Sequence, residues 1–398
     1  MTVWDALVGQ GETVEILRAA AAAAAQIAVG GEAASGSMTH AWLFTGPPGS
    51  GRSVAARAFA AALECTQPTM DGPGCGACSG CRAVLGTRHP DVHTVVPEGL
   101  SISVAEMRAV VGEASRRPMV GSWQAMIIED ADRLTEAASN ALLKVVEEPP
   151  RRTVFLLCAP STHPDDVAVT IRSRCRAIAL RTPSAEAIAA VLRAEGVEPD
   201  MAQWAAQASQ GHVGRARRLT RDEDARARRA AVLAVPGSLH TLRECQVAAD
   251  ALIVSAEAEA KAMSESVDDS ELDALRTAMG AGGTGKGSAT ATRGMAGAVK
   301  DLQQRQKSRA TRAQRDALDR ALIDLAAFYR DVLRQQAGSG GAAAHPEVAD
   351  TVATVAAAVT PAGALRRLDA VLACREALEL NVKPRIAVEA MVAALRLP

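Results

Sequence analysis

Short apolar runs alternate with helix-like segments over the first 180 residues. The segments between the runs, such as 103–117 and 136–148, place apolar residues at helical spacing. Because parallel strands joined by helices are covered on both faces, this alternation predicts an α/β domain with a parallel sheet. The strand-like runs are HAWLFTG (40–46), DVHTVVP (91–97), AMIIED (125–130) and TVFLLCAP (153–160), with RAIAL (176–180) preceding the first boundary.

Downstream of Pro183 the pattern is helical, with no further strand-like run of the same quality. We therefore place the α/β domain at residues 1–182. Residues 183–235 contain short helical segments broken at Gly196 and Gly211, which predict a small all-α lid. Residues 236–398 predict an all-α C-terminal domain. Its Gly/Ser-rich stretch predicts a flexible insert at about 280–308.

Composition limits the classes of function. Lys plus Arg is 44 and Asp plus Glu is 45, a net charge of −1, so the chain as a whole has no electrostatic attraction to nucleic acid or membrane. Aromatic residues make up only 2%, which disfavours a stacking surface for single-stranded bases. No stretch of about 20 apolar residues is free of charge, and the first ten residues do not resemble a signal peptide. We expect a cytoplasmic protein without a membrane partner.

A glycine-rich loop follows the first strand-like run. It fits G-x-x-x-x-G-K-[ST] at every fixed position except that of the lysine, which is Arg52. In such loops glycines let backbone N–H groups surround phosphate at the positive end of the next helix, and a hydroxyl contacts Mg²⁺. The candidate residues for binding ATP or ADP with Mg²⁺ are Gly46, Gly49, Gly51, Arg52 and Ser53.

Two acids end a later strand, where P-loop proteins hold Mg²⁺ and orient water. They are Glu129 and Asp130, in the reverse of the usual Asp-Glu order. If Glu129 takes the metal side, the longer acid crowds the ion, and Asp130 falls about one methylene short of the water. Catalysis depends on placement within about an ångström. The sequence therefore predicts weak or absent ATP hydrolysis.

Four cysteines follow the predicted P-loop helix within 17 residues: Cys65, Cys75, Cys78 and Cys81. Glycines between them allow the tight turns that let four thiolates converge on one ion. Four thiolates are typical of a closed, tetrahedral zinc site with no open position for water. We predict a structural zinc insert at residues 65–81.

With these motifs placed, the sequence resembles the AAA+ clamp-loader family of bacterial DNA polymerase III, and within it the delta-prime subunits. ASNALLKVVEEPP (138–150) and Ser173-Arg174-Cys175 are highly specific to these loaders, and the resemblance also includes Val8-Gly9-Gln10 and Asn381-Val382-Lys383-Pro384-Arg385. It implies an AAA+ fold with a C-terminal collar. It also implies a hetero-oligomeric ring with tau/gamma and delta subunits, which loads a sliding clamp on primed DNA.

The resemblance also implies roles for single residues. Arg174 would act in trans at the ATP site of a neighbouring subunit, stabilising charge on the transferred phosphoryl group. Val8, Gly9 and Gln10 would line an adenine pocket. A lid arginine is expected in a G-x-x-R setting, but here Gly214 takes that place and Arg215 comes one residue late.

These departures favour a stationary subunit whose own ATP hydrolysis is weak or absent. Two alternatives stay open. One is a tau/gamma-like or free-standing ATPase, whose turnover Arg52→Ala would abolish. The other is a zinc-dependent adaptor with a vestigial P-loop, in which removal of the metal, and not Arg174→Ala, would abolish partner binding.

Overall fold

The computed structural model describes residues 2–31, 37–278, 288–340 and 342–396. The chain divides into two compact units, residues 1–220 and 221–398. The first contains a parallel sheet and the second is helical. The expected order, an α/β domain followed by helical parts, is therefore confirmed.

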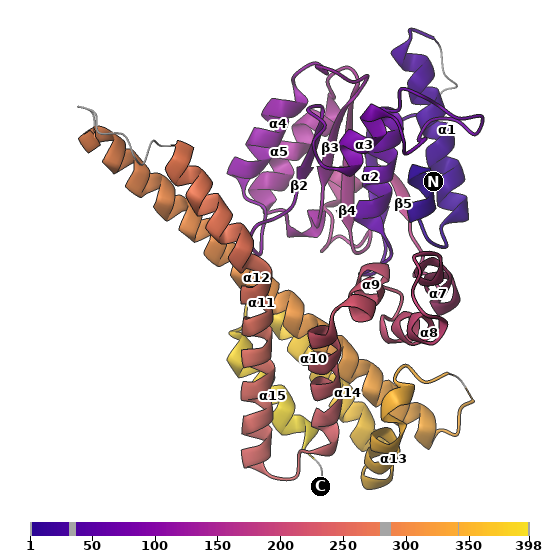
Figure 1. Cartoon of the computed structure of the whole chain (residues 1–398), viewed down its shortest axis with the longest axis vertical. Coiled ribbons are helices and arrows are strands. Elements are labelled where there is room, and N and C mark those ends of the chain that lie inside the picture. The colour runs from indigo at the N-terminus through magenta and orange to yellow at the C-terminus, as the bar shows by residue number, and fades with distance from the viewer. Residues whose placement is uncertain (1, 32–36, 279–287, 341, 397–398) are drawn as a thin grey trace. The chain divides into compact units, whose positions relative to one another are not determined.

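A five-stranded parallel sheet forms the centre of the first unit, with the strand order β2-β3-β4-β1-β5 (Figure 1). Strand β1 lies between β4 and β5, so the loop that leaves it emerges in the interior of the sheet. The strands are β1 (Ala41–Thr45), β2 (Val92–Val95), β3 (Gln124–Ile128), β4 (Thr153–Ala159) and β5 (Arg176–Ala179).

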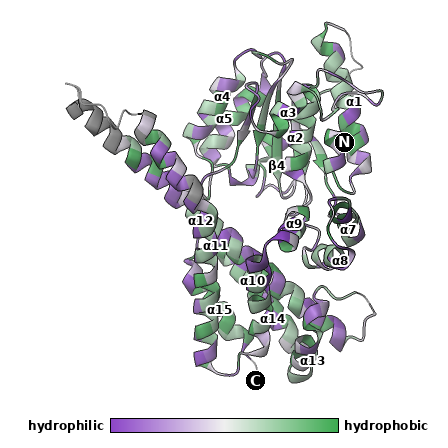
Figure 2. Cartoon of the chain, viewed as in Figure 1, coloured by the Kyte–Doolittle hydropathy of each residue, from purple (hydrophilic) through white to green (hydrophobic). Residues whose placement is uncertain are grey.

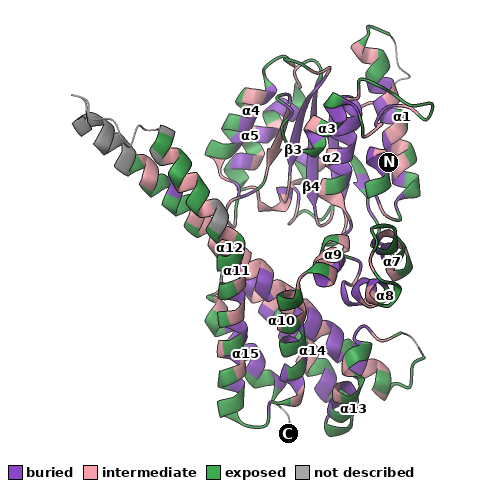
Figure 3. Ribbon diagram, viewed as in Figure 1, coloured by how far each residue is buried: buried purple, intermediate pink, exposed green. Residues whose placement is uncertain are grey.

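Helices cover both faces of this sheet. Alternate residues of β1 point to opposite faces: Trp42 and Phe44 pack with α1, α2 and α3, whereas Leu43 packs with α4, α5 and α6. The strands β1, β3 and β4 are buried throughout, as their apolar composition predicts (Figures 2 and 3). The helices are α1 (Gly11–Ala28), α2 (Arg52–Leu63), α3 (Ser79–Leu85), α4 (Val104–Ala114), α5 (Glu136–Glu147) and α6 (Val169–Arg172).

Three short helices complete the first unit after the sheet: α7 (Ala185–Ala194), α8 (Pro199–Ala208) and α9 (Val213–Arg221). The first two of them end near Gly196 and Gly211, the two glycines that the sequence singled out. Gly211 has a φ of +91°, and a Cβ there would lie 2.0 Å from Cγ2 of Thr182. Only glycine suits this turn between α8 and α9, which places the start of α9 against the sheet domain.

The second unit is a helical assembly with its own apolar core. Its first helix packs against the longest one through Arg229, a buried arginine whose guanidinium contacts His345, Glu347 and Asp324. The helices are α10 (Glu223–Ala234), α11 (Leu242–Ala278), α12 (Ser288–Gln336), α13 (Ala349–Ala358), α14 (Pro361–Glu379) and α15 (Pro384–Leu395). Since α10 belongs to this unit, the three-part division at 182 and 235 stays a prediction.

The flexible insert expected at about 280–308 is wrong for residues 288–308, which form the beginning of α12. Residues 280–287 lie outside the described part of the chain. Glycine-rich composition suggested a loop, but α12 runs alongside α11, and this pairing supports a helix that propensity alone does not predict. Arg309 of α12 pairs with Asp268 and Glu271 of α11 at 2.7 and 2.5 Å. This arginine therefore joins the two helices.

Across the described residues, no single helix is long and apolar enough to span a membrane. One bent pair of helical segments, Pro346–Ala358 and Pro361–Glu379, meets the criterion by length and composition.

Candidate functional site

The glycine-rich loop connects β1 to α2, as the sequence predicts. Gly51 caps α2 with a φ of +94°, and Gly49 has a φ of +86°. A Cβ on Gly49 would lie 2.6 Å from Cβ of His212, the residue just before α9. Glycine at this position therefore serves two purposes: it adopts the left-handed backbone, and it lets the lid helix approach the loop.

Arg52, in the place of the usual lysine, folds back over its own loop. Its Nη1 donates a hydrogen bond of 2.9 Å to the carbonyl oxygen of Gly46. Ser50 lies in the same loop, and its buried hydroxyl oxygen has no hydrogen-bond partner in the described structure. Buried polar atoms without partners are uncommon, and they indicate a place where a polar ligand or water binds.

The two strand-end acids lie in different environments. Glu129 accepts a hydrogen bond of 3.2 Å from Nη2 of Arg57 on α2. Asp130 has a φ of +51° and begins the short turn that follows β3. The carboxylate expected to hold Mg²⁺ is thus paired with a guanidinium, so the residues present do not fit a Mg²⁺ site at this position.

Two further groups lie beside these acids, and the sequence analysis did not select them. Burial and the charge of Asp130 raise the pKa of Asp132, whose Oδ1 is buried without a hydrogen-bond partner among the described atoms. Burial, together with the charge of Glu129, raises the pKa of the Cys158 thiol to about 12; this thiol also contacts Ser53. Asp132 stands in the same acidic run as Glu129, which is a signal that sequence reasoning could have used. For Cys158 the sequence shows only an apolar run, which does not indicate a functional residue.

Gln10 connects the N-terminal segment to this site. Its side-chain amide donates to the carbonyl oxygens of Arg181 at 2.6 Å and of Ser50 at 3.4 Å, and its Oε1 accepts from the Arg181 N–H. Gly9 has a φ of +72°, and Val8 is half-buried. The contacts of Gln10 hold the P-loop against the chain that enters the lid. The adenine pocket expected at Val8, Gly9 and Gln10 stays a prediction.

The lid approaches the loop through His212. The backbone N–H of Arg215 donates to Nδ1 of His212 at 3.2 Å, which fixes the imidazole at the start of α9. Arg215 is half-buried. Its expected role at a nucleotide stays a prediction.

Arg174 follows the short helix α6 and is more exposed than the P-loop site. Its Nη2 lies 2.7 Å from Oε1 of Glu147, at the end of α5, and the two side chains are 38% and 40% exposed. Its Nη1 donates to the carbonyl oxygen of Thr170 at 2.9 Å and to the Ser173 hydroxyl at 3.2 Å. The guanidinium is therefore oriented by this chain and still accessible to another molecule.

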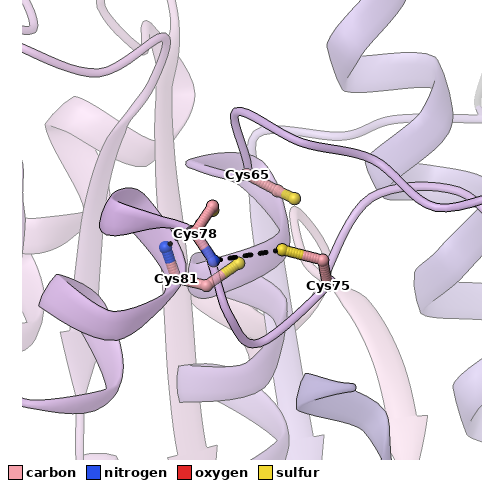
Figure 4. Close-up of side chains that lie close together, drawn as sticks. All are labelled: Cys65, Cys75, Cys78 and Cys81. Atoms are coloured by element: carbon pink, nitrogen blue, oxygen red, sulfur yellow. Dashed lines mark hydrogen bonds between the residues drawn. The ribbon is translucent and has the colours of Figure 1, made fainter. Parts of the chain in front are cut away.

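The four cysteine sulfurs lie within 4.8 Å of one another, as Figure 4 shows for their side chains. The N–H groups of Ala77 and Cys78 donate to the sulfur of Cys75 at 3.4 and 3.3 Å, and the N–H of Cys81 donates to the sulfur of Cys78 at 3.4 Å. Burial is the largest single influence and opposes ionisation of Cys78, but hydrogen bonds from Cys81 and Thr66 together outweigh it and lower the thiol pKa to about 6. Four converging sulfurs with backbone donors fit zinc.

Comparisons with known proteins agree with these motifs. Residues 24–184 match the family described as "DNA polymerase III, delta subunit". The delta-prime subunit of Bacillus subtilis (strain 168) is 32% identical over 203 residues, which is 51% of this chain and 60% of that protein. The delta-prime subunit of Escherichia coli (strain K12) is 33% identical over 192 residues, which is 48% of this chain and 57% of that protein.

The tau subunit of Bacillus subtilis (strain 168) is also related, at 32% identity over 151 residues, which is 38% of this chain and 26% of that protein. The chain thus spans about three-fifths of the length of the delta-prime relatives and a quarter of that of tau. The family match contains the P-loop, the four cysteines and Arg174. The resemblance seen in the motifs is therefore confirmed: this part of the chain is similar to the delta-prime and tau subunits of DNA polymerase III.

Proposed function

We propose that the chain is the stationary, delta-prime-like subunit of a clamp loader and that it supplies Arg174 to the ATP site of a neighbouring subunit. The observation that carries this proposal is the setting of Arg174. A guanidinium that completes another subunit's site must be accessible and already oriented, and Arg174 meets both conditions. In phosphoryl transfer such an arginine stabilises the charge that develops on the transferred group.

The chain's own P-loop supports the same division of roles. Hydrolysis requires a metal-holding carboxylate and a second group that orients water. Glu129 is paired with Arg57, and Asp130 lies in a left-handed turn. Together with Arg52 in the place of lysine, this arrangement favours weak or absent hydrolysis by the chain itself.

The proposed partners are tau/gamma and delta subunits in a hetero-oligomeric ring, which loads a sliding clamp on primed DNA. The four cysteines would hold a structural zinc ion. This ion would stiffen the insert, because a site with four protein ligands leaves no position for water or substrate.

A tau/gamma-like ATPase is the second candidate, favoured by the well-formed glycine loop and by the tau relative. It predicts ATP turnover by the isolated chain that Arg52→Ala abolishes. If the chain is instead the stationary subunit, its ATP turnover is weak or absent and Arg52→Ala has little or nothing to remove.

The proposal is tested by DNA-stimulated ATP turnover of a reconstituted loader that carries Arg174→Ala in this chain. Turnover should fall by about tenfold or more, because an arginine of this kind contributes on the order of 10³ to 10⁵ in rate. Arg108→Ala, at an exposed arginine on α4, is the matched control and should not change turnover. Equal turnover with Arg174→Ala and the wild-type chain, in loaders assembled to the same extent, would refute the proposal.

A further inference from the structure

The guanidinium of Arg57 pairs with Glu129, the carboxylate that the P-loop motif assigns to a metal ion. Arg57 comes four residues after Ser53, so the two share one face of α2. Ser53 is the hydroxyl expected at Mg²⁺, and Glu129 is the expected carboxylate. The guanidinium of Arg57 reaches Glu129 from this face at 3.2 Å, with the side chains of Arg57 and Glu129 35% and 19% exposed. A cation of the chain itself thus occupies the carboxylate expected to hold the metal.

The charges around the loop oppose a divalent ion. Mg²⁺ is held by free carboxylate oxygens and is repelled by a neighbouring guanidinium. Two guanidinium groups, of Arg52 and Arg57, belong to the first turns of α2. The balance therefore favours phosphate over a second cation.

The loop and the Arg57–Glu129 pair both have unused hydrogen-bonding capacity. The Nε of Arg57 and the hydroxyl of Ser50 are buried, and neither has a hydrogen-bond partner within the described ranges. Arg57 uses only Nη2 for Glu129, so it keeps further donors, and a guanidinium has five N–H donors in a fixed plane. Such donors match phosphate oxygens.

We propose that this P-loop binds the phosphate groups of a nucleotide without a divalent cation, with Arg57 held by Glu129 in the position that Mg²⁺ would otherwise occupy. The inference deepens the proposed function, on which it rests for a site that does not hydrolyse ATP. Without a metal and with its carboxylate paired, the site would retain nucleotide as a structural ligand.

The test is the affinity of the full chain for ADP, measured by calorimetry in Mg²⁺ and again in EDTA. The two dissociation constants should agree within about twofold. In Arg57→Gln, Glu129 is released, and Mg²⁺ should strengthen ADP binding by about fivefold or more relative to EDTA. The double variant Arg57→Gln/Ser53→Ala should lose this gain, because the hydroxyl expected at the metal is gone. Arg108→Gln is the matched control and should behave as the wild-type chain.

Three results would overturn the inference: wild-type binding that weakens about tenfold or more in EDTA, no ADP binding in either buffer, or no Mg²⁺ dependence in a folded Arg57→Gln. The wild-type comparison decides the question even where a variant does not fold. The result is also separate from the role of Arg174, because ADP binding uses the isolated chain and the Arg174 test uses the loader's turnover.

Discussion

Two arginine–glutamate pairs of the first unit differ in their setting. Arg57 and Glu129 meet beside the P-loop, where the carboxylate is only 19% exposed, whereas Arg174 and Glu147 meet at a surface where both side chains are about two-fifths exposed. A partly buried pair is less screened by water and holds its partners more firmly than an exposed one. In the proposals above, the first pair would keep a carboxylate away from metal, and the second would leave a guanidinium able to change partners.

Under the proposed function, this difference separates a site that does not hydrolyse ATP from an arginine that supports a neighbour's site. The glycine loop, the sheet and the lid are retained, so the frame that positions Arg174 is intact. The departures from the motifs are single side chains: Arg52 in the loop, Glu129 and Asp130 at the end of β3, and Gly214 where the lid arginine is expected. The proposed function thus follows from a few side chains on a conserved type of scaffold.

The largest expected effect concerns the chain's own hydrolysis. Because Glu129 is paired with Arg57, the isolated chain should show no ATP turnover above background, with or without DNA. The measurement is phosphate release by the wild-type chain and by Arg52→Ala. ATP turnover that Arg52→Ala removes would contradict the proposal, because the chain's own P-loop would then be an active ATP site despite the Arg57–Glu129 pair.

Removal of the metal should affect the cysteine insert and spare both pairs. Zinc binding contributes about 10–16 kcal/mol in small zinc-dependent folds, so the insert, residues 65–81, should unfold on chelation. The helices of the second unit have their own apolar core, so most of the ellipticity should remain. Proteolysis within the insert, followed alongside circular dichroism, tests this. A loss of most ellipticity at the same chelator concentration would contradict it.

Gly49→Ala should destabilise the P-loop and leave the pair of Arg174 and Glu147 unchanged. The substitution forces alanine into a left-handed backbone and against His212, which should lower the free energy of unfolding by about 2–4 kcal/mol. The matched control is Gly112→Ala, within α4, where a Cβ would contact nothing. This control should stabilise the chain by about 0.5–1 kcal/mol. Equal effects of the two substitutions in thermal unfolding would show that the close approach of His212 is unimportant.

The smallest expected effect is that of Glu147→Gln. The pair with Arg174 is exposed, so its loss should change the free energy of unfolding by less than about 1 kcal/mol. Chemical denaturation of the variant and the wild-type chain measures the difference. A destabilisation well above this range would mean that the pair holds the fold together and is not free to exchange partners.

The strands and the glycine loop could be predicted from the sequence better than the side-chain contacts at the carboxyl ends of the strands. Apolar runs located the buried strands β1, β3 and β4, and glycines located the loop and the turn between α8 and α9, because burial and left-handed backbone leave clear patterns. The pairing of Arg57 with Glu129 was not predicted, since the partners are 72 residues apart and Arg57 stands in an alanine-rich helix. Residues 288–308 were expected to be a flexible insert because their composition does not favour a helix. They are helical in the structure, where α12 packs against α11, and such packing cannot be seen in the local sequence.

The central claim is that this chain completes a neighbour's ATP site through Arg174. The most direct measurement determines bound nucleotide and DNA-stimulated turnover in the same preparation of a loader that carries Arg174→Ala. The account predicts unchanged nucleotide occupancy and a turnover reduced by about tenfold or more. Unchanged turnover, or occupancy that falls in step with turnover, would contradict it, because Arg174 would then be idle or would serve only assembly.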